Sequence, residues 1–453
     1  MYEQESLLTL GVTGEWIWGN DLETIVFAQA SGHQKTSIFR FALAIAQRPE
    51  SLPARIVNCY HELPVDSASA TFPDRASMRM AIWSAIATVW PKYLPSQISW
   101  SIRHDNLFNE YVDLLLPLNQ LSLQQSIDTI EFKKLVRLNP LGGRGCTTLV
   151  HKSSDPLSRF VFKGTDFRSY LDHYEDGYIR EEVKIFYRSV QLVSNMPRHP
   201  NIMAPPETLV TISKSADATQ YVCGSLYPFY TNGSLDGRIE RGNEFGERIP
   251  LSCKAHWCYQ MAVAIAHTHF VARTYHMDIK PGNFLIDVDG NLVLIDWEQS
   301  DTPVTTAAPE IDGTWDVEEV PAQGSNNTLR YTKYNGPERR NMPENTPGNN
   351  GWNVWNVFPE WSKQCPKALE LAEVFSLGRC MWMVLRQPDM AAFDGITSTE
   401  EVVEDWDSSE DIPARWKQVV QDCLKHDPNE RIGLHDLVNS WDNARHEIDN
   451  FEV

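Results

Sequence analysis

The stretch Tyr275-His-Met-Asp-Ile-Lys-Pro-Gly-Asn-Phe-Leu-Ile-Asp-Val-Asp-Gly-Asn-Leu-Val-Leu-Ile-Asp-Trp-Glu298 decides how the whole chain is interpreted. Two apolar runs, 284–288 and 291–295, flank the pair Asp289-Gly290, which is typical of a two-residue hairpin turn. In such a hairpin Asn283 and Asp296 face each other, with Cβ atoms ~5 Å apart. The sequence therefore predicts that a carboxamide and a carboxylate meet at the open end of a hairpin.

Polar residues in and just before this hairpin indicate its chemistry. Oxygen ligands such as Asn283 and Asp296 suit Mg²⁺, which binds one or two carboxylates and completes its shell with water and phosphate. Upstream, Pro281 excludes a helix interior, so Asp278 and Lys280 are expected on a loop. An Asp beside a metal site can accept a hydroxyl proton, and a nearby Lys can neutralise phosphate charge.

These residues resemble the catalytic loop and the metal-binding strand of protein kinases. The segment His276-Met-Asp-Ile-Lys-Pro-Gly-Asn283 is similar to H-R-D-L-K-P-x-N, with Met277 in the Arg position. The triplet Asp296-Trp-Glu298 stands where D-F-G is expected, with Glu298 in the Gly position. A surface hairpin with unrelated carboxylates would not explain five polar matches at fixed spacing.

The resemblance implies a role for each polar residue of the stretch. Asp278 and Lys280 are expected to be catalytic, and Asn283 and Asp296 are expected to hold Mg²⁺, with Mn²⁺ as an alternative metal. A Lys two residues after the Asp is the pattern of Ser/Thr kinases rather than Tyr kinases.

The composition of the chain narrows the class of partner. Its 453 residues suggest two or three domains. The net charge of −20, from 60 acidic and 40 basic residues, argues against nucleic acid or an anionic membrane as partner. Such a charge either favours basic protein substrates or only aids solubility. The oligomeric state stays open.

Cysteine usage and the N-terminus bear on the compartment. The eight cysteines form no Cys-x-x-Cys pair, which indicates a reduced protein. Met1-Tyr-Glu-Gln-Glu5 has no basic region followed by an apolar core, so no secretory signal is expected. No run of about 18 apolar residues is present. We therefore expect an intracellular protein, cytoplasmic or nuclear, without a transmembrane segment.

Residues 1–130 contain no recognisable motif. Apolar periodicity predicts helices at Lys35–Gln47, Arg75–Trp90 and Leu107–Leu116. We expect an N-terminal accessory region of mixed helix and loop, whose fold and role the sequence does not define.

The next stretch of the chain resembles the start of a kinase small lobe. A strand is predicted at Phe132–Leu138. It is followed by Gly143-x-Gly145-x-x-Thr148-x-Val150, which is similar to the kinase loop G-x-G-x-x-G-x-V with Thr in the third Gly position. Glycine lets backbone N–H groups approach phosphates. The resemblance implies that Gly143, Gly145 and Val150 contact ATP.

A lysine and a helical glutamate form the second nucleotide-binding element. The predicted helix Tyr178–Val193 places Ile179, Val183, Phe186, Val190 and Val193 on one face. Glu182 lies at the edge of this face, whereas Glu181 points to the far side. We expect Glu182 to pair with Lys163 at the end of the strand Phe160-Val-Phe-Lys163, with Glu181 as the alternative. In kinases this ion pair binds the α- and β-phosphates.

The segment Gly224–Leu235 resembles the strand and hinge that join kinase lobes. The resemblance implies that Pro228, Phe229 and Tyr230 contact the adenine edge of ATP. Tyr227 is expected to narrow the pocket behind the adenine.

Three motifs in the C-terminal half resemble the large lobe. Gly336-Pro-Glu338 is similar to the A-P-E end of the activation segment, which makes that segment longer than usual. Cys423–Ile432 is similar to C-x-x-x-D-P-x-x-R, and we expect its Arg431 to form a buried salt bridge with Glu338. Glu373 replaces the Asp that normally binds the catalytic-loop backbone, and its extra methylene either shifts the loop or is absorbed.

Further expectations concern packing and loops. Trp297 is expected to pack against Phe186 and His276. Residues 341–367 are expected to be a loop insertion, and the acidic run Glu400–Asp411 a solvated loop.

The sequence thus predicts an α+β, bilobal protein-kinase-like fold. The kinase domain covers residues 131–445, with a small lobe at 131–230 and a large lobe at 231–445, after the accessory region 1–130. The expected function is ATP-dependent phosphoryl transfer to Ser or Thr of a protein substrate.

Two other functions remain open. A pseudokinase or scaffold that binds ATP without turnover is suggested by Thr148, Glu298 and Glu373. A small-molecule phosphotransferase is suggested by Ile295-Asp-Trp-Glu298, which resembles the aminoglycoside and choline kinases.

Overall fold

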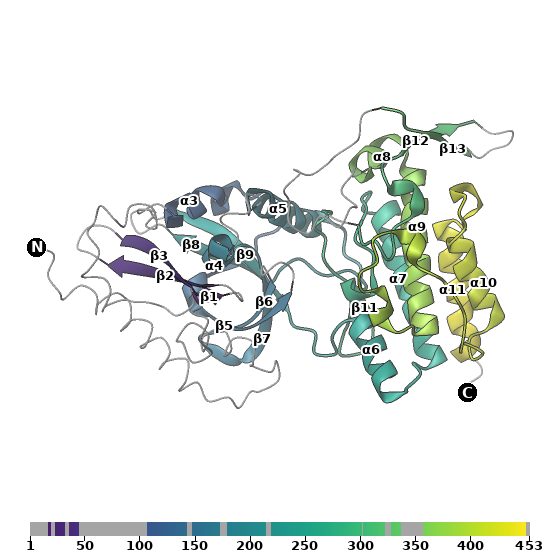
Figure 1. The fold of residues 1–453 in the computed structure, drawn as a ribbon, viewed down its shortest axis with the longest axis horizontal. Helices are drawn as coiled ribbons and strands as arrows, with labels where there is room; N and C mark the ends of the chain where they lie inside the picture. The colour runs from purple at the N-terminus through teal and green to yellow at the C-terminus, as the bar shows by residue number, and fades with distance from the viewer. Residues whose placement is uncertain are drawn as a thin grey trace, which may run out of the picture. The chain divides into compact units, whose positions relative to one another are not determined.

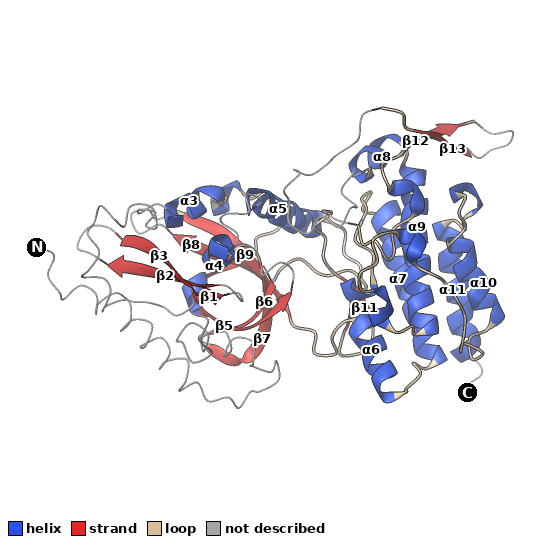
Figure 2. Cartoon of the chain, viewed as in Figure 1, coloured by secondary structure: helices blue, strands red, loops and turns tan. Residues whose placement is uncertain are grey.

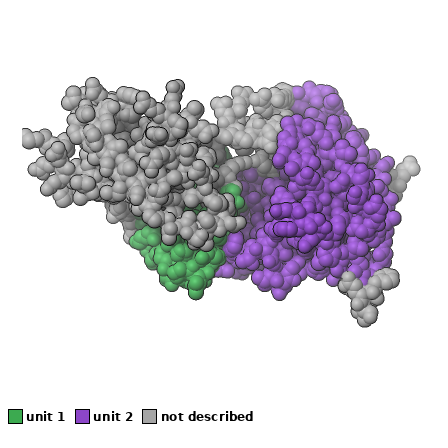
Figure 3. Space-filling view, turned by 60° about the horizontal axis from the view of Figure 1, so that its bottom comes forward, with its two compact units in different colours: residues 1–120, 129–183, 209–226 green, residues 121–128, 184–208, 227–453 purple. Residues whose placement is uncertain are grey.

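The computed structural model describes the residues 17–19, 23–31, 36–44, 107–142, 147–172, 179–213, 219–300, 302–321, 328–336 and 357–449. The chain divides into two compact units, which Figure 3 colours separately. The first unit comprises residues 1–120, 129–183 and 209–226. The second comprises residues 121–128, 184–208 and 227–453.

A six-stranded sheet lies in the first unit (Figures 1 and 2). Its strand order is β4-β8-β9-β7-β6-β5. Its strands are β4 (Asp128–Glu131), β5 (Leu135–Gly142), β6 (Thr147–Lys152), β7 (Asp155–Lys163), β8 (Thr208–Ser213) and β9 (Gln220–Pro228). In β6, Thr148 and Val150 are buried whereas Leu149 is half-buried, as expected for a strand with one covered face. The strand predicted at 132–138 starts later, because Phe132–Lys134 forms a 3₁₀ turn.

Helices α3 (Leu107–Leu114) and α5 (Ile179–Asn195) confirm two sequence predictions. A short helix, α4 (Phe167–Asp172), lies between them in the chain. The apolar face predicted for α5 is buried at all five positions, namely Ile179, Val183, Phe186, Val190 and Val193. The 3.6-residue periodicity therefore identified the buried face of α5 correctly.

The prediction of a helix at Lys35–Gln47 is wrong. Residues Thr36–Ala44 form strand β3, which pairs with β2 (Glu23–Ser31), and β2 in turn pairs with β1 (Ile17–Gly19). The sequence Phe39-Arg-Phe-Ala-Leu43 alternates large apolar residues at period two, a strand signal that the helical interpretation overlooked. The helix predicted at Arg75–Trp90 lies outside the described residues.

The second unit is mainly helical (Figure 2). It includes most of α5, from Lys184 on. Its other described helices are α6 (Leu235–Phe245), α7 (Leu251–Phe270), α8 (Phe358–Gln364), α9 (Pro366–Arg386), α10 (Ala414–Cys423) and α11 (Leu434–Asp449). Helix α9 is buried without interruption from Ala368 to Leu385 and contacts α7, α8, α10 and α11. Its buried polar residues therefore need internal partners. Among the described helices, none combines the length and apolar character needed to cross a membrane.

The predicted hairpin is present but its register differs by one residue. Strands β10 (Phe284–Ile286) and β11 (Leu292–Leu294) are antiparallel, with Phe284 opposite Leu294. Continuing this register places Asn283 opposite Ile295, whose N–H donates to the Asn283 carbonyl at 2.9 Å. The predicted pairing of Asn283 with Asp296 is therefore wrong, although Asp296 is the next residue along the strand.

The turn chemistry explains this difference in register. Asp287 Oδ1 accepts from the N–H groups of Asp289 (2.9 Å) and Asn291 (2.7 Å). Within this fully described turn, Gly290 alone has a positive φ, of 83°. A three-residue loop ending in a left-handed glycine thus replaces the predicted two-residue turn.

A second antiparallel hairpin, β12 (Trp315–Val320) and β13 (Thr328–Lys333), is attached to the helical core. Leu329 is buried, and its N–H and carbonyl bond to the Asn429 side chain at 2.9 and 3.0 Å. Part of the loop predicted at 341–367 is instead α8, because Phe358 and Trp361 are apolar residues one turn apart and both are buried.

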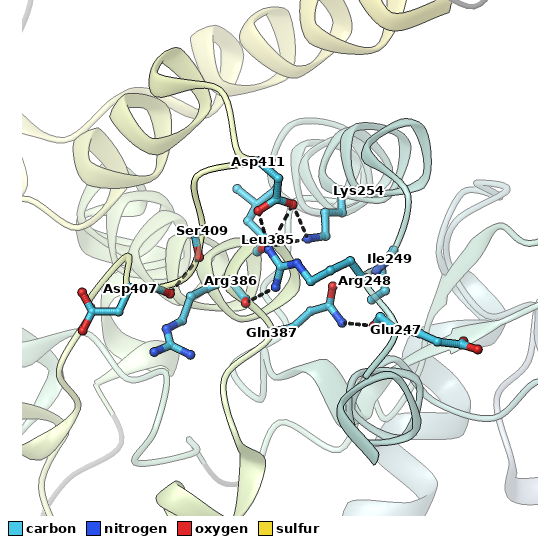
Figure 4. A network of polar contacts seen from close by, with 10 residues as sticks. All are labelled: Glu247, Arg248, Ile249, Lys254, Leu385, Arg386, Gln387, Asp407, Ser409 and Asp411. Atoms are coloured by element: carbon cyan, nitrogen blue, oxygen red, sulfur yellow. Dashed lines mark hydrogen bonds and ion pairs between the residues drawn. The ribbon is translucent and has the colours of Figure 1, made fainter. Parts of the chain in front are cut away.

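A polar network lies at the C-terminal end of α9 (Figure 4). Arg248 donates to both oxygens of Asp411, at 2.9 and 3.1 Å, and to the carbonyls of Leu385 and Arg386. The fully buried Lys254 donates to the Leu385 carbonyl at 2.6 Å and lies 3.8 Å from Asp411. Burial, with repulsion from Arg248, lowers the pKa of Lys254 to about 8.

Candidate active site

Glu373 links helix α9 to the loop that contains the candidate catalytic residues. Its Oε1 accepts from the N–H groups of His276 (2.8 Å) and Met277 (2.6 Å), and its Oε2 lies 2.6 Å from His269 Nε2. Burial raises the pKa of Glu373, but His269 and the Met277 N–H more than offset this effect, so the pKa lies below its ordinary value of 4.5. The extra methylene is absorbed, since the carboxylate still reaches the loop backbone.

Asp278 is oriented by two neighbours in the loop. Its Oδ2 accepts from Lys280 Nζ at 2.8 Å and from Asn283 Nδ2 at 2.8 Å. Asn283 Nδ2 also donates to the Asp278 carbonyl at 2.7 Å. The other carboxylate oxygen, Oδ1, is buried and has no hydrogen-bond partner among the described residues. A buried acceptor without a partner is uncommon, which makes Asp278 a candidate for a functional role.

The residues expected to hold a metal lie at the open end of the β10–β11 hairpin. Asn283 precedes β10, and Asp296 follows the residue opposite Asn283. Because Asn283 Nδ2 is bonded to Asp278, its oxygen Oδ1 is the atom that it can offer to a cation. Asp296 has a φ of 68° and Met277 a φ of 77°, and such left-handed non-glycine residues concentrate at functional sites. The donor set of one amide oxygen and one carboxylate fits Mg²⁺.

The described residues contain no group of three or more His, Cys, Asp or Glu side chains that could bind a metal. A Mg²⁺ site completed by water and phosphate does not need such a group.

The contact predicted between Trp297 and His276 is confirmed. Their ring centroids are 4.7 Å apart in an edge-to-face arrangement, and Trp297 is buried. His276 Nε2 lies 2.7 Å from the carbonyl of Ile295, the residue directly after β11, and this contact joins the loop to the hairpin. The contact with Phe186 stays a prediction. Trp297 therefore has a packing role in this core.

The partner predicted for Arg431 is wrong. Arg431 donates to Glu310 through Nη1 (2.5 Å) and Nη2 (2.8 Å), and both side chains are buried. Glu310 ends the sequence Ala308-Pro-Glu310, an unaltered A-P-E motif that the sequence interpretation passed over. Glu338 itself lies outside the described residues. The activation segment therefore runs only from Asp296 to Glu310, and the β12–β13 hairpin follows it as an insertion.

The structure describes only some of the nucleotide-binding residues that were predicted in the small lobe. Gly143 and Gly145 lie outside the described residues. Val150 is buried in β6, Lys163 is the last residue of β7, and Glu182 lies in the first turn of α5. The ion pair between Lys163 and Glu182 stays a prediction.

Thr148, which replaces the third glycine of the loop motif, takes part in a polar cluster. Its Oγ1 accepts from Arg137 Nη2 at 3.2 Å, and Arg137 Nη1 lies 2.7 Å from Asp166 Oδ2. Thr148 and Asp166 are both buried. The hydroxyl of this threonine is therefore satisfied within the small lobe.

The predicted hinge follows β9. Tyr227 is buried, Pro228 is exposed, and Phe229 and Tyr230 are half-buried. Burial raises the pKa of Tyr230, and the carboxylates of Asp287 and Glu207 add to the effect. The phenol therefore stays protonated at neutral pH. Contact of these residues with adenine stays a prediction.

The fold and these motifs resemble those of the protein-kinase family. A sheet-rich unit is followed by a helical unit that carries Asp278, Lys280 and Asn283 on one loop. In the same unit a buried Arg431 binds the glutamate of an A-P-E motif.

Comparison with known proteins agrees at the level of the family. CBL-interacting serine/threonine-protein kinase 24 of Arabidopsis thaliana is 33% identical over 111 residues, which is 24% of this chain and 22% of that protein. CBL-interacting serine/threonine-protein kinase 19 of the same plant is 30% identical over 121 residues, 27% of this chain and 20% of that protein.

Protein kinase PINOID of Oryza sativa subsp. japonica is 28% identical over 117 residues, 26% of this chain and 23% of that protein. The chain spans about a fifth of the length of these relatives. No family model matches the chain.

Proposed function

We propose that this chain transfers the γ-phosphate of ATP to a serine or threonine of a protein substrate. The observation that carries the proposal is the arrangement around Asp278. Lys280 and Asn283 bind one of its carboxylate oxygens, and the other oxygen has no partner among the described residues. A fixed carboxylate with one uncommitted oxygen suits a base that accepts a hydroxyl proton.

The remaining roles follow from the chemistry of phosphoryl transfer. Bound Mg-ATP supplies the phosphoryl group, and the metal neutralises charge on the phosphates. Asn283 and Asp296 would hold the metal, and Lys280 would neutralise charge on the γ-phosphate. Lys163, paired with Glu182, would bind the α- and β-phosphates.

Three features support a protein substrate over a small molecule. Lys280 follows the Ser/Thr kinase pattern, the A-P-E glutamate Glu310 binds Arg431, and two of the matched relatives are serine/threonine-protein kinases by name. The net charge of −20 favours basic protein substrates.

A protein that binds ATP without turnover is the second candidate, and Glu298 favours it. Glu298 occupies the glycine position two residues after Asp296. A carboxylate there adds negative charge beside the metal site and removes the backbone freedom of glycine.

Phosphate transfer from labelled ATP distinguishes these candidates. The full chain is incubated with Mg-ATP, and in parallel with Mn-ATP, and label is followed into the chain itself and into a generic basic protein. We expect transfer by the wild type, and a loss of about 100-fold or more in Asp278→Asn. Asp289→Asn, in the exposed turn of the same hairpin, is the matched control and should transfer normally.

Equal transfer by wild type and Asp278→Asn would overturn the assignment of the base. No transfer with either metal, by folded protein that ATP still stabilises against heat, would favour the pseudokinase.

A further inference from the structure

The segment Asp296–Glu310 approaches the catalytic loop through apolar contacts where kinases use an arginine. Met277, in the position of the arginine that reads a phosphorylated segment, is buried. It belongs to an apolar cluster that includes Ala307, Ala308 and Phe358. The residue in the arginine position, Met277, is thus part of a hydrophobic core.

Three successive residues of the segment bind the rest of the unit through polar contacts. Thr306 Oγ1 donates to the carbonyl of Ile279, the residue between Asp278 and Lys280, at 2.5 Å. The Thr305 carbonyl accepts from Arg379 Nη1 at 3.0 Å. The Ala307 carbonyl accepts from Thr399 Oγ1 at 2.7 Å. The segment therefore bonds to the catalytic loop on one side and to Arg379 and Thr399 on the other.

Arg379 is the residue that joins these contacts. It projects from α9, is 4% exposed, and donates to Thr399 Oγ1 (2.8 Å), the Thr399 carbonyl (2.9 Å) and Glu404 Oε1 (2.7 Å). Its guanidinium lies 5.1 Å from the centroid of the Phe375 ring. A buried guanidinium is tolerated only when its donors are satisfied in this way. The expectation that Glu400–Asp411 is only a solvated loop is therefore wrong, because Glu404 binds a buried cation.

We propose that Arg379 is a positioning residue that fixes Thr305–Ala307 against Ile279, so that the site keeps its working arrangement without a phosphate on the segment. Arg379 binds the Thr305 carbonyl, and Thr399 binds the Ala307 carbonyl. These two contacts hold the segment in place, as a contact between a phosphate and an arginine can hold a phosphorylated segment. The inference deepens the proposed function, and its consequence for turnover rests on that function. The attachment of the segment by Arg379 does not depend on the proposed function.

Hydrogen exchange tests the attachment without any need for activity. The N–H groups of Thr306 and Ala307 both donate to the Pro303 carbonyl, at 3.1 and 2.9 Å, so their exchange reports on the segment. The probe is the full chain after phosphatase treatment, as wild type, Arg379→Met and Arg379→Lys. Arg386→Met is the matched control, because Arg386 lies on the same helix and binds Asp405 of the same acidic run.

We expect exchange at Thr306 and Ala307 to accelerate about tenfold or more in Arg379→Met, less in Arg379→Lys, and not at all in Arg386→Met. Unchanged exchange in Arg379→Met would overturn the proposal. Equal acceleration along all of α9 in both methionine variants would also overturn it, because that result shows only a general loss of stability.

Kinetics then address turnover. Phosphatase-treated wild type should retain its transfer rate, and Arg379→Met should lose about tenfold or more in kcat with little change in KM for ATP. Loss of wild-type activity on phosphatase treatment would overturn the proposed independence from phosphate. A wild type that transfers nothing before treatment contradicts the proposed function, whereas the exchange result still decides the role of Arg379.

Discussion

Two arginine–carboxylate networks in the helical unit use the same chemistry at opposite degrees of burial. The side chains of Arg431 and Glu310 are 0% and 7% exposed, whereas those of Arg248 and Asp411 are 39% and 38% exposed. In both networks a guanidinium binds both oxygens of its carboxylate. Arg431 uses two nitrogens for this contact and Arg248 uses only Nη2. Because water also screens only the second pair effectively, the two pairs should differ strongly in their energetic contribution.

The comparison shows where the fold places its buried polar contacts. Near the catalytic loop, Glu310, Glu373 and Arg379 are all buried. Glu310 binds Arg431 through both carboxylate oxygens, and Glu373 and Arg379 each have several partners. At the C-terminal end of α9, Arg248 and Asp411 stay partly in water (Figure 4). Removing one partner should therefore be costly near the site and mild at the far end.

The largest effect is expected for Glu310→Gln. The change leaves the buried Arg431 cation without its counter-charge, so the free energy of unfolding should fall by ~3–5 kcal/mol. Urea unfolding of the full chain measures this change. In the double variant Glu310→Leu with Arg431→Met, most of the loss should be recovered, because no uncompensated charge remains. A cost below about 1 kcal/mol for Glu310→Gln would show that burial does not separate the two networks.

A smaller effect, dependent on pH, is expected for Glu373→Gln. At neutral pH the loss of charged hydrogen bonds to the loop and to His269 should cost ~1.5–3 kcal/mol. The pKa of Glu373 is lower in the folded protein, so its stabilisation is present above the ordinary value of 4.5 and is lost as pH falls through the folded pKa.

Thermal melting of wild type and Glu373→Gln from pH 7 to pH 3 measures this dependence. The difference between the two melting temperatures should shrink on acidification. A difference that is constant over the whole range would argue against an ionised Glu373 in the native state.

The smallest effect is expected for Arg248→Met. The exposed pair with Asp411 should contribute ~1 kcal/mol or less, and the contribution should shrink in about 1 M salt. Repulsion from Arg248 also lowers the pKa of Lys254, so the variant should raise that pKa above about 8. Chemical denaturation at low and high salt tests the first point. A loss as large as that of Glu310→Gln would contradict the comparison.

The catalytic loop could be predicted because its information is local. His276–Asn283 specifies residue types at fixed spacing, and the structure brings Asp278, Lys280 and Asn283 together as that spacing suggests. The register of the following hairpin could not be predicted from Asp289-Gly290 alone. The Asp287 side chain bonds two backbone N–H groups and lengthens the turn by one residue.

The end of the activation segment was missed for a different reason. Ala308-Pro-Glu310 is a complete motif, but Gly336-Pro-Glu338 resembles it and lies in the same half of the chain. The choice between them depends on which glutamate reaches Arg431, a contact between residues 121 positions apart. His269 was overlooked likewise, because its role depends on the tertiary contact with Glu373.

The β12–β13 hairpin has a consequence for how this chain tolerates changes in length. The Tyr334 N–H donates to the Thr314 carbonyl at 2.7 Å, so the two ends of the hairpin are held side by side. Loop-closure entropy grows only slowly with length once the ends are joined. Val317, Leu329 and Tyr331 pack against the helical unit, so added or removed residues should be tolerated best between Val320 and Thr328, away from these contacts. The β12–β13 hairpin, which follows the A-P-E motif, is thus a place where the chain can gain new sequence while the catalytic core stays unchanged.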